Sequence, residues 1–70
     1  MIRSNVKRLM EERGVTLKQM VKETGLAEMT LIRARRNQIA ACRLDTLIAI
    51  ARYLGCEIGD LFSIADRETF

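Results

Sequence analysis

The chain of 70 residues contains no histidine and no proline, and it has only two cysteines, four glycines and three aromatic residues. Without histidine, no side chain is an obvious general base near neutral pH. The lack of proline and the scarcity of glycine favour an all-helical fold. Hydrophobic runs are also short, and the longest, residues 47–51, cannot span a bilayer. The core must therefore be small and built from aliphatic side chains and methionine.

The two cysteines do not suggest a metal or redox site. Cys42 and Cys56 stand fourteen positions apart, which fits neither a zinc-ligand spacing nor a thioredoxin-type pair. The N-terminus has no apolar run long enough for secretion, so we expect a cytoplasmic protein with reduced thiols. Cys56 is expected to pack as a small apolar residue.

No group of residues has the pattern of a catalytic site. The adjacent carboxylates Glu11 and Glu12 point to diverging parts of a helix surface, and neither cysteine has an evident activating partner. The glycines do not form a phosphate-binding loop. The sequence predicts no enzyme, no cofactor, no metal site, no membrane partner and no small-molecule effector.

Positive charge is concentrated in one stretch of the chain. Residues 28–43 contain four arginines and one glutamate, whereas the remaining residues have eight basic and eight acidic side chains. A surface that binds a polyanion requires such an uneven distribution. An ordinary solvated face would show the same pattern, so charge alone leaves both interpretations open.

Hydrophobic periodicity and capping residues predict two helices in the first third of the chain. The first is capped by Ser4 or Asn5 and runs to about Arg13. The second is capped by Thr16, with Gln19 three positions later completing a capping box. Gly25 then ends the second helix.

The remaining elements follow from the same signals. A third helix is predicted over about residues 28–36, a loop over 37–43, a fourth helix over about 45–54 and a short fifth helix near 58–62. The two ends of the domain, around Ile2 and Ile64, could pair as strands. The side chains expected to face the core are Val6, Leu9, Met10, Leu17, Met20, Val21, Leu26, Leu31, Ala34, Leu44, Leu47, Ile50, Ala51, Leu54, Leu61 and Phe62.

The second and third helices, joined by a turn at Gly25, have the layout of a DNA-binding helix-turn-helix. The side chains that would point outward from the third helix are Glu28, Met29, Ile32, Arg33 and Arg36. Arg33 could bond guanine in two places, and Glu28 could accept from the cytosine amino group. Met29 and Ile32 could contact thymine methyl groups. Arg36, Gln38 and Arg43 would lie where phosphates run.

Each of these residues also has a purely structural interpretation. Arginines near the end of the third helix could solvate its C-terminus, and Glu28 could complement the helix dipole. Met29 and Ile32 lie opposite the core side, so they indicate a contact surface for DNA or for another protein.

An ordered set of residues resembles the phage-repressor/Cro-type (Xre-type) helix-turn-helix family over about residues 2–62. The matching residues are Asn5-Val6-Lys7 with Leu9, Gly14-Val15-Thr16, Gly25-Leu26, Thr30-Leu31, Leu44-Asp45-Thr46-Leu47 with Ile50-Ala51, Leu54-Gly55 and Leu61-Phe62. The resemblance implies one lambda-repressor-like domain over residues 1–70, a five-helix bundle with its core in 2–62 and a tail in 63–70. It also implies binding to double-stranded DNA, commonly as a homodimer, as in small stand-alone bacterial and phage regulators.

By position, the resemblance implies contacts to bases from Glu28, Met29 and Arg33. The residues that it places near phosphates are Thr16, Leu17, Thr30, Arg36, Gln38 and Arg43. The departures from the family pattern are Leu17 in place of Gln, Val21 in place of Ala, Ala27 in place of a Ser or Thr cap, Ile32 in place of a polar residue, Arg35 in place of Glu and Asn37 in place of Gly. The missing cap at Ala27 should weaken the start of the third helix by about 1 kcal/mol.

Two functions follow from these observations. The first is a sequence-specific transcriptional regulator that inserts the third helix into the major groove as a homodimer, because one helix buries too little for tight binding. The second is a protein-interaction module, antitoxin-like or accessory, that uses Leu17, Met29 and Ile32 as its contact surface. The candidates for a dimer surface are Leu61, Phe62, Ile64 and Phe70, which exceed what a small core needs.

Overall fold

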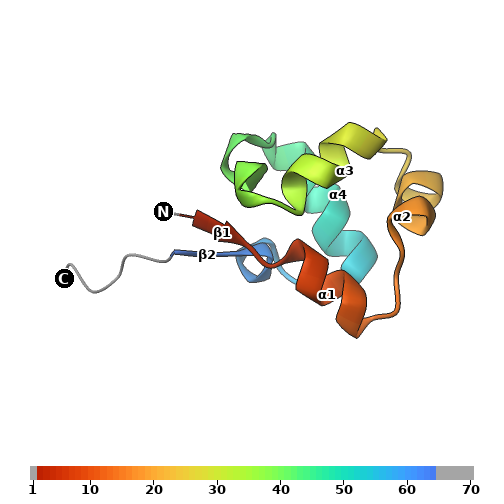
Figure 1. Ribbon diagram of the computed structural model, residues 1–70, viewed down its shortest axis with the longest axis horizontal. Coiled ribbons are helices and arrows are strands. Elements are labelled where there is room, and N and C mark those ends of the chain that lie inside the picture. The colour runs from red at the N-terminus through yellow and green to blue at the C-terminus, as the bar shows by residue number, and fades with distance from the viewer. Residues whose placement is uncertain (1, 65–70) are drawn as a thin grey trace.

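The computed structural model describes residues 2–64, which form four α-helices, two 3₁₀ helices and a two-stranded sheet (Figure 1). The elements in chain order are β1 (Ile2–Ser4), α1 (Val6–Glu12), α2 (Leu17–Thr24), α3 (Glu28–Ala34), η1 (Asn37–Ala41), α4 (Leu44–Leu54), η2 (Ile58–Leu61) and β2 (Phe62–Ile64). The paired strands lie at one end of the molecule and α2 at the other. No helix in this part of the chain has the length and apolar character that a membrane span needs.

The predicted five-helix count is wrong, because the segment expected as a fifth helix forms only the short 3₁₀ helix η2. The backbone becomes extended at Phe62, where φ is −149° and ψ is 161°, and the chain continues as β2. Strand pairing with β1 therefore takes over where a further helical turn would have started.

The capping box of α2 is confirmed. The Gln19 backbone N–H donates to Thr16 Oγ1 over 3.1 Å, and the Thr16 backbone N–H donates to Gln19 Oε1 over 2.9 Å. Helix α2 ends at Gly25, whose φ of +76° is left-handed. Both ends of this helix are thus set by local residues.

The start of α1 uses Ser4 rather than Asn5 for its side-chain bond. The Val6 backbone N–H donates to Ser4 Oγ over 3.2 Å, whereas Asn5 makes no capping bond. The Asn5 side chain instead donates to Ser63 Oγ over 3.0 Å. Asn5 therefore ties the start of α1 to the strand β2.

The segment after α3 differs from the prediction. Helix α3 ends at Ala34, and residues 37–41, expected as loop, form the 3₁₀ helix η1. Ile39 is 1% exposed and belongs to the core, although it is not among the predicted core residues. Burial of this one side chain holds the segment against α3 and β1, which are the elements that η1 contacts.

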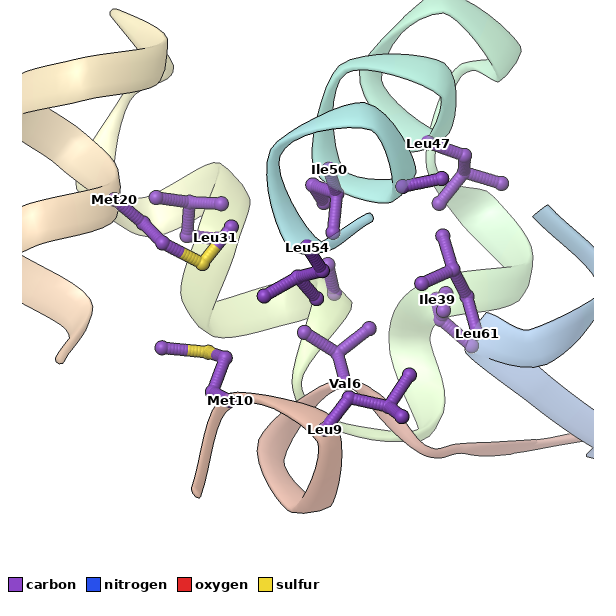
Figure 2. Packing of buried hydrophobic residues seen from close by; sticks show 12 residues of the cluster. Val6, Leu9, Met10, Met20, Leu31, Ile39, Leu47, Ile50, Leu54 and Leu61 are labelled. Atoms are coloured by element: carbon purple, nitrogen blue, oxygen red, sulfur yellow. The ribbon is translucent and has the colours of Figure 1, made fainter. Parts of the chain in front are cut away.

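The core contains twelve buried side chains from the four α-helices and both 3₁₀ helices (Figure 2). They are Val6, Leu9, Met10, Met20, Leu31, Ala34, Ile39, Leu47, Ile50, Ala51, Leu54 and Leu61. Met20 and Leu31 lie together between α2 and α3 in Figure 2. The half-buried side chains Leu17, Val21, Leu26, Cys56 and Phe62 pack against this cluster.

The prediction that Leu44 faces the core is wrong, because its side chain is 63% exposed. Leu44 is the first residue of α4, one turn before Ile48, which is 37% exposed. Neither side chain lies on the side of α4 from which Ile50 and Leu54 pack into the core. Helix α4 thus presents two apolar side chains to solvent.

The predicted pairing of the chain ends is confirmed, because β1 and β2 are antiparallel with Ile2 opposite Ile64. Leu61 is fully buried, so its proposed place on a dimer surface is wrong. Ile64 is 54% exposed. Phe70, another candidate for that surface, lies outside the described residues.

Candidate nucleic-acid interface

The turn between α2 and α3 is fixed by Thr24 and Gly25. Thr24 Oγ1 donates to the Met20 carbonyl over 2.5 Å and accepts from the Leu26 backbone N–H over 3.2 Å. Leu26 packs against the core from this turn. Helix α3 is therefore held against α2 on its inner side, where Leu31 is fully buried.

Helix α3 lies beside α2 and above α4 in Figure 1, and its outer side faces solvent. Glu28, Met29, Arg33 and Arg36 are exposed, and Ile32 is half-buried. Met29 is 54% exposed and is one of four exposed large apolar residues within residues 2–64. The arginines are thus free to reach a ligand rather than enclosed in the protein.

One flank of α3 borders a hollow of about 200 Å³, called here the Arg33 hollow. It is lined by Thr30, Arg33, Gln38, Ala41, Cys42, Arg43 and Thr46. Four of these, Thr30, Arg33, Gln38 and Arg43, are DNA-contacting residues in the sequence prediction. No carboxylate of residues 2–64 is part of the lining, so the hollow suits an anion.

The other flank borders a larger hollow of about 420 Å³, called here the Lys7 hollow. Its lining residues are Lys7, Leu17, Ile32, Arg35 and Arg36. Leu17, Ile32 and Arg36 are predicted contact residues, whereas Lys7 is not. Arg35 is predicted only as a cation near the end of a helix. No pattern in the sequence could show that α1 brings Lys7 next to α3.

The remaining predicted contact residues line neither hollow. Glu28 and Met29 are at the start of α3, and Thr16 is at the start of α2. The hydroxyl of Thr16 is occupied by the capping box, where it accepts from the Gln19 backbone N–H. These three residues lie near the N-terminal ends of the two helices.

Arg43, one of the two cations of the Arg33 hollow, forms only an exposed ion pair within the protein. Arg43 Nη2 lies 3.1 Å from Asp45 Oδ2, but the two side chains are 82% and 69% exposed. Such exposed pairs contribute little stability and exchange partners readily. Burial raises the pKa of the Cys42 thiol, and the nearby Arg33 partly offsets this rise.

Comparisons with known proteins assign the chain to a family. A family model described as the Cro/C1-type HTH DNA-binding domain matches residues 5–66. No curated protein and no solved structure matches the chain. The matched range contains α1 to η2, including the helix-turn-helix of α2 and α3. The chain therefore belongs to the family of Cro/C1-type helix-turn-helix DNA-binding domains.

Proposed function

We propose that the protein is a sequence-specific transcriptional regulator that inserts α3 into the major groove of double-stranded DNA. The observation that supports this proposal is the pair of cation-lined hollows on the two flanks of α3. Together they contain seven of the ten residues that the sequence assigned to DNA contact. A helix in the major groove, about 12 Å wide, has a phosphate backbone on each side. Two hollows that suit anions match this arrangement.

Base recognition falls to the exposed side of α3. Arg33 is exposed beside the groove-facing surface and could donate two hydrogen bonds to guanine. Glu28 could accept from cytosine, and Met29 could contact a thymine methyl group. Gln38 and Arg43, beyond α3, would contact phosphates.

The proposal includes a homodimer, because two copies of α3 are needed for tight binding to a two-fold site. It is supported by Leu44 and Ile48, which are exposed on one side of α4, and by Ile64 on β2. On this proposal the chain acts as one cytoplasmic domain without catalytic activity. Sedimentation with and without DNA tests the dimer, and a 1:1 complex at all concentrations would contradict it.

The decisive experiment is a selection of bound sites from a random DNA pool, followed by affinity measurements across salt concentrations. We expect an enriched site with two related halves and an affinity that falls steeply as salt rises. An enriched site without symmetry would contradict the dimer. Absence of DNA binding even at low salt would contradict the regulator itself.

A protein-interaction module is the second candidate, and the exposed Met29 favours it. In that case Met29, Leu17 and Ile32 would contact a protein partner, and DNA affinity would be weak or absent. The two cation-lined hollows favour the DNA regulator, since cations clustered without interspersed carboxylates attract a polyanion.

A further inference from the structure

The Lys7 hollow brings three cations together at the junction of α1, α2 and α3. Lys7 comes from α1, and Arg35 and Arg36 directly follow α3. Leu17 of α2 and Ile32 of α3 supply an apolar part of the lining. Charges beside apolar walls are less screened than charges in open water. Three like charges in this setting favour an anion between them.

Arg35 lines the hollow and is half-buried there. Its Nε atom is shielded from solvent and has no hydrogen-bond partner, the only such side-chain atom in residues 2–64. Buried polar groups in proteins are nearly always hydrogen-bonded, so this one needs an explanation. The guanidinium is planar, so the buried Nε also fixes the plane of its other N–H donors. No atom of residues 2–64 accepts a hydrogen bond from this Nε–H, and the terminal N–H groups of Arg35 are the ones that would serve a ligand in the open hollow.

Among residues 2–64, no acidic side chain forms an ion pair with this group of cations. The ion pairs within the described part of the chain join Arg8 and Arg13 to Glu12, and Arg43 to Asp45. None of them involves Lys7, Arg35 or Arg36. A phosphate group suits the site because it offers several acceptor oxygens to three donors at once, and arginine matches its geometry.

We propose that Lys7, Arg35 and Arg36 form a phosphate-binding site and that its ligand is a backbone phosphate of the bound DNA. This inference rests on the proposed function for the source of the phosphate. Ile32 lies on α3 and Arg36 lies just beyond its C-terminal end, and both line the hollow. A DNA strand beside α3 would therefore pass the mouth of the hollow.

The first experiment tests the site without DNA. Inorganic phosphate is titrated into the free protein at constant ionic strength, and the arginine Nε–H resonances are followed by NMR. We expect the Arg35 resonance to shift and saturate at millimolar phosphate, and Lys7→Gln to weaken this response about threefold or more. Arg52→Gln removes one exposed charge of α4 outside both hollows and should leave the response unchanged. An Arg35 resonance that responds no more to phosphate than to chloride would overturn the site.

The second experiment identifies the source of the phosphate. Single phosphates of the selected DNA are replaced by neutral methylphosphonates, and affinity is measured for the wild type and for Arg35→Gln. At one position the replacement should weaken wild-type binding about fivefold or more, but should have much less effect on the variant. Arg35→Gln should also reduce the salt slope by about 1, and circular dichroism checks that it folds. Arg52→Gln should behave as the wild type does.

The outcomes separate this inference from the proposed function. Suppose that the wild type binds DNA and that neither Arg35→Gln nor Lys7→Gln weakens that binding. The proposed contact with a DNA phosphate is then wrong, but the proposed DNA-binding function is not contradicted. If Arg35 responds to inorganic phosphate but the wild type binds no DNA, the DNA source is overturned together with the regulator. A free phosphate compound is then the ligand.

Discussion

The hydroxyl of Ser4 donates a hydrogen bond to the backbone carbonyl of Ala34, thirty positions along the chain. Ser4 ends β1, and Ala34 is the last residue of α3. Carbonyls at the C-terminal end of a helix lack a partner within the helix, so this bond satisfies one of them. The first strand thereby holds the end of the helix that would enter DNA.

Removal of this link should destabilise the fold. Ser4→Ala deletes the bond to Ala34 and the acceptor for the Val6 backbone N–H, so we expect a loss of about 1–2 kcal/mol in the free energy of unfolding. Urea denaturation measures the loss. Ser63→Ala is the control, because Ser63 is exposed and accepts from the Asn5 side chain. Equal effects of the two changes would show that the Ser4 bond adds nothing.

The start of α3 offers a stabilising change. Ala27 is the N-cap residue, has extended backbone angles and makes no side-chain bond to the helix. Ala27→Ser should supply an acceptor to the free N–H groups and raise the free energy of unfolding by about 0.5–2 kcal/mol. Thermal or urea denaturation measures this gain. A variant no more stable than the wild type would mean that the free N–H groups at the N-terminal end of α3 already have partners.

The left-handed conformation of Gly25 predicts a cost for any side chain there. A Cβ atom would meet nothing within 4 Å, so Gly25→Ala is opposed by backbone conformation alone. We expect a loss of about 1–2 kcal/mol in stability. Gly59 has equal space but no positive φ, and Gly59→Ala is the matched control with a smaller expected effect. Should both variants unfold at the same urea concentration, the turn does not depend on glycine.

Arg33 and Arg43 should affect DNA binding in different ways. Arg33→Ala should weaken binding to the selected site by about 1–3 kcal/mol and relax specificity at one base pair. Arg43→Ala should weaken binding to all sequences alike and lower the salt slope by about 1. Competition with single-base variants of the site distinguishes the two effects. If neither change alters affinity, these roles are wrong.

The Cys42 thiol reports on the Arg33 hollow through its pH dependence. Its pKa is raised above the ordinary 9.0, so less thiolate is present at any given pH and alkylation should be slow at pH 7. The rate should keep rising as pH increases through 9. Arg33→Gln removes the nearby cation that lowers this pKa, so the variant should react more slowly still.

The measurement uses Cys56→Ser, so that only Cys42 reacts with iodoacetamide. Bound DNA should cover the hollow and slow the reaction, whereas Cys56 in a Cys42→Ser protein should react as fast as without DNA. If DNA leaves the alkylation rate of Cys42 unchanged, the DNA does not cover the Arg33 hollow.

The elements that the sequence predicted correctly depend on neighbours along the chain. Thr16 and Gln19 close a capping box within one turn, and Gly25 ends α2 by its own backbone freedom. The predictions failed where distant parts decide the outcome. Ile39 is buried because η1 meets α3 and β1, and the fifth helix is cut short because Phe62 joins a strand. Leu44 is exposed because no element of the described residues covers that side of α4.

The sequence by itself determined the helix-turn-helix and the exposed arginine on α3, because helical spacing and turn residues act locally. Only the tertiary structure decided what lies on either side of that helix. Lys7 of α1 lines the same hollow as Arg35, and Gln38 and Arg43 line the same hollow as Arg33, because packing around Leu31 and Ile39 sets the neighbours of α3. The hydrophobic effect is non-directional and does not depend on the order of residues in the chain. The positions of the charged side chains at the edge of the core therefore follow from how the whole core assembles.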